Sequence, residues 1–170
     1  YGKNALRQAF TGGRVVVGVE NLKKNKWNID YHPEISFGMY NDRFSGKERS
    51  FTFNIPAKMK LDEQSTFSLG ISGNLTQFQN SSATYGNNLL KINPALDLNF
   101  KKTWIHIGIS PAFGKNNLTY FLPDLNLKSR VLNNQLLLVL GWKGEIVQNT
   151  FEALSTKNPF MDNVYLPRQT

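Results

Sequence analysis

Apolar and polar residues alternate along the stretch from Trp27 to Tyr40. Because side chains on a strand alternate between two faces, this stretch predicts a strand with one apolar and one polar face. The stretch contains 14 residues and would be roughly 45 Å long at about 3.3 Å per residue. A typical strand in a soluble protein has only about 5 or 6 residues. The odd positions are Trp27, Ile29, Tyr31, Pro33, Ile35, Phe37 and Met39, and the even positions are Asn28, Asp30, His32, Glu34, Ser36 and Gly38.

The same alternation recurs along the chain and predicts an all-β fold. We expect an antiparallel meander of about eight long strands that forms a single domain over residues 1–170. Five prolines fall inside the predicted strands, at positions 33, 56, 94, 111 and 123, and indicate local breaks, bulges or bends. The predicted strands cover residues 13–19, 27–40, 50–61, 66–78, 89–101, 103–113, 118–131 and 135–148.

A short helix is predicted after the last strand, over about residues 150–157. Asn149 has the side chain of a helix N-cap, and Glu152 follows at the spacing of a capping box. Asn158 and Pro159 then end the predicted helix.

The predicted connections differ in length. Residues 41–49 and 79–88 form long polar connections, whereas 62–65, 101–102 and 132–134 form short turns and 114–117 a moderate one. Short turns at one end and longer loops at the other are typical of outer-membrane β-barrels. The sequence therefore predicts such a barrel, or a segment of one. The alternative is a soluble β-sandwich or small closed barrel, which produces the same alternation with shorter strands.

In a membrane barrel the apolar face contacts outer-membrane lipid and the polar face lines a water-filled lumen. Aromatic residues near the strand ends fit a girdle at the membrane–water interface. No run of about 18 apolar residues occurs, which excludes a transmembrane helix from the sequence. The predicted girdle residues are Trp27, Phe51, Phe100, Phe113 and Trp142.

The chain carries a formal net charge of +8 and has a pI near 9.7. Its basic residues are scattered, so a nucleic-acid partner is not predicted. In a barrel, basic residues on the polar face favour an anionic solute. Alternatively, these long side chains lie at the edges of the membrane and reach toward water. The basic candidates are Lys58, Lys60, Lys91, Lys128, Arg130 and Lys143.

Little in the sequence indicates catalysis. Asp30, His32 and Glu34 share one strand face, and this row has the residue types for acid–base chemistry or cation binding. A solvated polar face produces the same row. The two histidines, His32 and His106, lack the spacing of a metal site, and the absence of Cys excludes thiolate ligands and disulfides. Nucleotide-binding and serine-hydrolase motifs are also missing. We expect no catalytic residues, metal site or cofactor.

Four short segments suggest a family. Tyr120-Phe121-Leu122-Pro123, the stretch 132–136, Gly141-Trp142 and Asn158-Pro159-Phe160 resemble the barrel portion of outer-membrane proteins of the Bacteroidetes type, some of which are similar to TonB-dependent receptors. The resemblance covers about the last third of the chain. It implies a location in the cell outer membrane and a role in solute passage or receptor-type uptake.

A complete TonB-dependent receptor would contain a plug domain and a barrel of about 22 strands, and would usually end in an aromatic residue. This sequence has no plug and no energy-coupling box, predicts about eight strands and ends in Thr170. The resemblance therefore implies that the chain is a segment whose barrel is completed by the remainder of a larger chain. The alternative function is that of a soluble cell-surface domain that binds a ligand or a protein partner.

Overall fold

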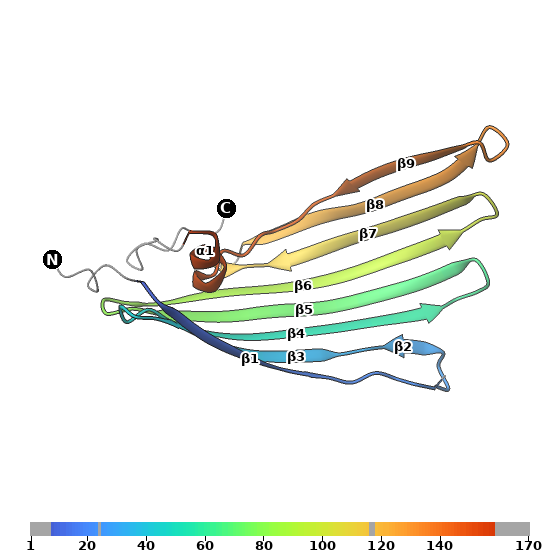
Figure 1. The fold of residues 1–170 in the computed structure, drawn as a ribbon. Coiled ribbons are helices and arrows are strands. Elements are labelled where there is room, and N and C mark those ends of the chain that lie inside the picture. Colours follow the sequence, from blue (N-terminus) through green and yellow to red (C-terminus); the bar gives the residue numbers. More distant parts are fainter. Residues whose placement is uncertain (1–7, 24, 116–117, 159–170) are drawn as a thin grey trace.

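The structure is a computed structural model that describes residues 8–23, 25–115 and 118–158 (Figure 1). In this part of the chain, nine strands form one sheet and one short helix follows them. The elements are β1 (Phe10–Gly18), β2 (Ile29–Tyr31), β3 (Glu34–Asp42), β4 (Lys47–Lys60), β5 (Ser65–Gln79), β6 (Thr84–Asn99), β7 (Thr103–Phe113), β8 (Thr119–Val131), β9 (Leu136–Lys143) and α1 (Phe151–Lys157).

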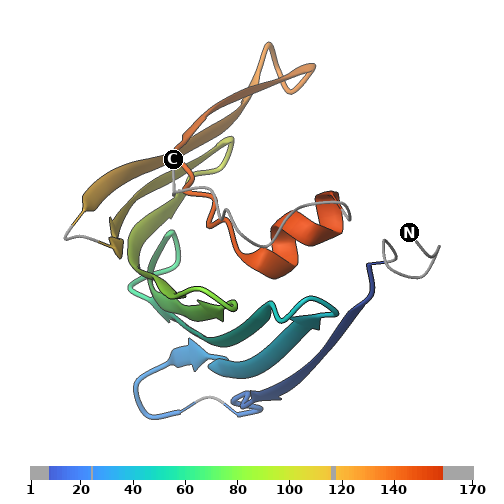
Figure 2. The same cartoon turned by 90° about the vertical axis from the view of Figure 1, so that its left-hand side faces the viewer.

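The sheet is an antiparallel meander in the order β1-β3-β4-β5-β6-β7-β8-β9, which confirms the predicted fold class. The sheet does not close, and β1 and β9 are its two edges. Figure 2 shows that the sheet is strongly curved and that α1 lies inside its concavity. No helix in the described part of the chain is long and apolar enough to cross a membrane.

The strand predicted over 27–40 is divided by Pro33 into β2 and β3. Both parts pair with β4, and the register of the pairing is the same on the two sides of the break. Pro56 of β4 lies opposite the gap, so the two prolines remove N–H donors from the same place in the ladder. A second gap, between β6 and β7, contains Pro94 and Pro111 and likewise leaves the register unchanged. At these two places the prolines interrupt the ladder without shifting it.

The predicted alternation of long and short connections is wrong. From β3 onward, every connection between consecutive strands contains only three to five residues. The supposed loops 41–49 and 79–88 are largely strand, because β3 runs to Asp42, β4 begins at Lys47 and β6 begins at Thr84. The longest connection within the sheet joins β1 to β2, at the end of the sheet opposite α1 (Figure 1).

Asp and Asn side chains account for these tight turns. Asp42, Asp62 and Asn80 each stand at the start of a turn, and one Oδ1 atom accepts two backbone N–H groups from the residues that follow. Each turn is therefore closed by its first residue. As a result the strands continue into polar stretches of the sequence that were predicted to be loops. The donors are Phe44 and Gly46 at 2.8 and 2.6 Å, Gln64 and Ser65 at 2.7 Å each, and Ser82 and Ala83 at 2.9 and 2.8 Å.

The N-cap of the helix lies one residue later than predicted. Thr150, and not Asn149, is the N-cap, and its Oγ1 accepts the N–H of Ala153 at 3.1 Å. Glu152 therefore does not complete a capping box. The N–H groups of the first two helical residues, Phe151 and Glu152, instead donate to the carboxylate of Glu48 of β4. A carboxylate at a helix N-terminus satisfies free N–H donors and interacts favourably with the helix dipole.

An aromatic cluster holds α1 against the sheet. Phe151 is fully buried, and its ring lies 4.7 Å from that of Phe78, 5.9 Å from Tyr40 and 6.2 Å from Phe10. These rings come from β1, β3 and β5, so the helix bridges three strands. An ion pair of 2.8 Å between Arg14 and Glu152 adds a contact to the edge strand β1.

We expect Phe151→Ala to detach α1 from the sheet. Loss of a fully buried phenylalanine typically costs about 3–5 kcal/mol, which raises the opening equilibrium of the helix at least about a hundredfold. Hydrogen exchange of the α1 amides measures this opening. Thr156→Ala, at an exposed position of the same helix, is the matched control, and unchanged protection in Phe151→Ala would contradict the anchoring role.

The turn between β4 and β5 should depend on pH. The N–H of Gln64 donates to Asp62 and lowers the pKa of this exposed carboxyl. Because the folded-state pKa is depressed, the stabilisation is complete above the unfolded-state pKa of about 3.9 and is lost as the pH falls through the lower folded-state value. Chemical denaturation should show that wild-type stability falls relative to Asp62→Asn over this acidic range. An equal difference at every pH would refute the coupling.

Candidate lipid-facing surface and polar concave face

The two faces of the sheet have opposite polarity, and the apolar one points outward. Cross-strand register places the apolar positions of each strand on the convex face, away from α1. Most of these side chains are exposed, among them Ile35, Phe37, Phe51, Ile55, Leu75, Ile107, Ile109, Leu125, Leu138, Leu140 and Trp142. Monomeric soluble proteins rarely expose contiguous apolar patches larger than a few hundred Å². An exposed apolar face of this kind is typical of a surface that contacts another protein or a membrane.

The length of this apolar surface can be compared with the lipid-facing band of known membrane barrels. The convex positions are apolar from Phe51 of β4 to Leu61, the residue that follows this strand, a path of about 33 Å. At the strand tilt of about 40° found in membrane barrels, this path spans about 25 Å, the height of their lipid-facing band. Polar convex positions such as Arg49 and Gln77 follow at the α1 end, and Asp62 begins the turn at the other end.

The concave face is polar. Register places Ser36, Thr52, Asn74 and Asn93 on this face, together with the charged residues of β6 to β8. Several of the most buried side chains in the described part of the chain belong to this polar face, including Ser36, Glu48, Ser50 and Thr76. A hydrophobic core is thus confined to the aromatic cluster beneath α1 and a few neighbours.

A hydrogen-bonded network occupies the concave face of β6, β7 and β8. Nδ1 of His106 lies 2.8 Å from Oδ1 of Asp97, and its Nε2 lies 3.7 Å from Oδ2 of Asp124. Asn126 donates to the second carboxylate at 3.0 Å. Gly108 leaves room for the imidazole, since a Cβ there would lie 3.2 Å from Nε2 of His106. The side chains of His106, Asp97 and Asp124 keep 18%, 22% and 28% of their surface exposed, so water can reach all three.

The network continues toward the end of the sheet that lies opposite α1. The Trp104 ring stacks on His106 with 5.9 Å between ring centroids, and Lys128 lies over the indole with its Nζ 5.2 Å from the centroid. This arrangement joins two carboxylates, one imidazole, one aromatic ring and one ammonium group on a single surface. Such a surface can bind polar or charged groups of a solute.

The predicted lumen residues all fall on the concave face by register, except His32, which lies in the gap between β2 and β3. Two pairs become cross-strand neighbours: Asp30 with Lys58, and Asp124 with Lys143. Lys143 forms its ion pair with Glu145, at 3.4 Å. The other predicted residues, Glu34, Lys60, Lys91, Lys128 and Arg130, are distributed over several strands and do not form one cluster.

The predicted girdle aromatics are exposed, and all but Phe51, which lies four residues inside β4, occur at or near strand ends. Trp27 and Phe100 lie in connections at the end opposite α1, and Phe51, Phe113 and Trp142 lie on the convex sides of β4, β7 and β9. The predicted segment Asn158-Pro159-Phe160 extends beyond the described residues from Pro159 onward.

Two functional elements were missed by sequence reasoning. Asp97, His106 and Asp124 are polar residues that lie close together in the sequence. Only cross-strand pairing shows that their side chains meet. Glu48 lay in a supposed loop, more than 100 residues before the helix that it caps. Within residues 8–23, 25–115 and 118–158, no three His, Asp or Glu side chains are grouped so that they could hold a metal ion.

We expect His106→Ala to destabilise the sheet by about 1–3 kcal/mol, because Asp97 and Asp124 would lose the group that links them. His32→Ala is the matched control, since His32 is exposed and its side chain makes no hydrogen bond with the described residues. The control should change stability by no more than about 0.5 kcal/mol. Denaturant titration measures both, and equal effects would show that the network contributes nothing specific.

Comparison with models of known protein families, with curated proteins and with solved structures finds no match for this chain. Its function is therefore inferred from the geometry of the two faces.

Proposed function

We propose that this chain forms part of the wall of an outer-membrane β-barrel that takes part in solute passage or receptor-type uptake, without catalysing a reaction. The observation that carries the proposal is the reversed polarity of the sheet, with exposed apolar side chains on the convex face and polar side chains on the concave face. Lipid is the environment that suits such a convex face, and water suits the concave one.

The two open edges support a segment of a larger barrel. With respect to the described residues, β1 and β9 each present an outer row of backbone N–H and C=O groups that pairs with no further strand, and β9 is exposed along its whole length. In lipid each unsatisfied backbone group costs several kcal/mol, so membrane sheets are closed. We propose that further strands pair with these edges, supplied by the remainder of a larger barrel chain.

The position of α1 also supports a wide barrel. A barrel of about eight strands has an interior that side chains alone fill, whereas a helix with its side chains is about 10–12 Å wide. The concavity of this sheet accommodates α1 together with the aromatic rings beneath it (Figure 2). A barrel with this curvature would therefore contain more strands than the sheet described here.

The solute would contact the concave face. Its charged side chains are of both signs, with Asp97 and Asp124 around His106 and several Lys and Arg residues on neighbouring strands. The excess of basic groups favours an anionic solute. Asp30, His32 and Glu34 belong to this solvated surface in our proposal and have no catalytic role.

Tryptophan fluorescence tests the membrane location. Trp142 lies on the convex face with 66% of its surface exposed, whereas Trp104 lies on the concave face beneath Lys128. In single-tryptophan variants folded into bilayers, lipids brominated on their acyl chains should quench Trp142 much more strongly than Trp104. An aqueous quencher should show the opposite preference.

The soluble alternative predicts a different outcome. If the chain runs as a folded monomer or dimer in buffer without detergent, and Trp142 escapes quenching by brominated lipid, then a protein partner covers the convex face. The membrane proposal would then be abandoned in favour of a cell-surface domain that binds a ligand or partner.

A further inference from the structure

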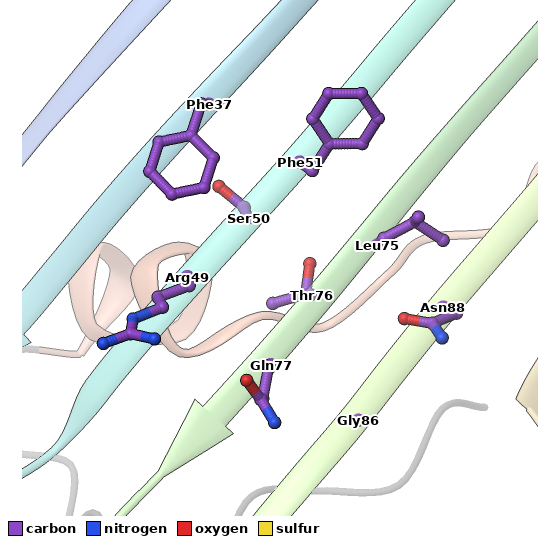
Figure 3. Close-up of a pocket in the computed structure, with 9 residues that line it drawn as sticks. All are labelled: Phe37, Arg49, Ser50, Phe51, Leu75, Thr76, Gln77, Gly86 and Asn88. Carbon is purple, nitrogen blue, oxygen red and sulfur yellow. The ribbon is translucent and has the colours of Figure 1, made fainter.

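A hollow of about 360 Å³ lies on the convex surface where the apolar band gives way to polar residues. Figure 3 shows its lining: Phe37, Phe51 and Leu75 lie toward the apolar band, and Arg49, Gln77 and Gly86 lie toward the α1 end. These side chains come from β3, β4, β5 and β6, so the hollow crosses four adjacent strands.

Arg49 is the only cationic residue that lines the hollow. Its guanidinium is exposed and makes no ion pair with any residue of the described ranges. Lys47 lies two residues before Arg49 on the same strand. It also projects to the convex side and is further from the apolar band. Two cations thus stand beside the band, at the level where lipid headgroups meet the hydrocarbon chains.

Gly86 creates the space beside Arg49. It is the cross-strand partner of Gln77, which is itself the partner of Arg49. A Cβ atom built on Gly86 would meet nothing within 4 Å, and its backbone does not adopt a positive φ. The absent side chain leaves an opening flanked by the amide groups of Gln77 and Asn88, which can donate hydrogen bonds to phosphate oxygens.

We infer that this hollow binds an anionic phospholipid, with the phosphate at Arg49 and an acyl chain against Phe37, Phe51 and Leu75. The planar guanidinium suits bidentate contact with phosphate, and the amides of Gln77 and Asn88 supply further donors. The inference rests on the proposed membrane location of the convex face and adds to it one specific lipid site.

The test uses the folded chain in micelles of an uncharged maltoside detergent, with phosphatidylglycerol as the probe and native mass spectrometry as the readout. Arg49→Gln should weaken binding of the lipid about tenfold or more, because one charge-assisted contact is lost. Lys58→Gln removes the same charge from the same strand on the concave face and should leave binding unchanged.

Gly86→Leu provides a second variant that keeps every charge. Its side chain would fill the opening and should weaken binding to a similar degree while the sheet stays folded. Inorganic phosphate at the lipid's concentration should not compete, because it lacks the acyl chain. Equal loss in Arg49→Gln and Lys58→Gln, full binding by Gly86→Leu, or effective competition by phosphate would each overturn the inference.

Quenching of Trp142 by brominated lipid in parallel samples separates this inference from the proposed function. If Trp142 is quenched while Arg49→Gln binds lipid as well as Lys58→Gln does, the lipid site is refuted and the membrane location stands. If Trp142 is not quenched, the membrane location fails and the lipid site fails with it.

Discussion

Antiparallel pairing of backbone groups in a constant register is the constraint on which this structure depends. With only a small aromatic cluster and few other buried apolar residues, the sheet is held mainly by its antiparallel pairing from β1 to β9. Because each pair of strands keeps one register, most apolar positions fall on the convex face and most polar positions on the concave face, with convex exceptions such as Arg49 and Gln77 at the α1 end. The apolar convex band, the polar concave surface and the hollow at Arg49 all follow from that register.

The same constraint explains why the prolines do little damage. Pro33 and Pro56 occupy the same gap in the ladder, and Pro94 and Pro111 share another. Each pair concentrates its missing N–H donors in one place, so the strands resume their pairing without a shift. A shift by one residue would have moved the apolar side chains onto the concave face.

The helix gives the concave face its only apolar centre in the described part of the chain. Phe151 inserts between rings from three strands, and Glu48 satisfies the first N–H groups of the helix. The helix lies over one end of the concave face, and the network around His106 lies further along the sheet, where water can reach it. In the proposed barrel, α1 would narrow the lumen near one end while the polar surface lines the remainder.

The sequence by itself determined the strand-forming segments, the two-faced character of each strand and the short helix near residue 151, because alternation with period two is a local property. It did not determine the loop lengths, since polar residues occur equally in turns and in strand ends, and the turn-closing role of Asp42 and Asn80 decided the outcome. Only the tertiary structure decided which face is concave. It also decided that Glu48 caps a helix 103 residues away and that Asp97, His106 and Asp124 meet. These features depend on cross-strand register and sheet curvature, which no single strand contains.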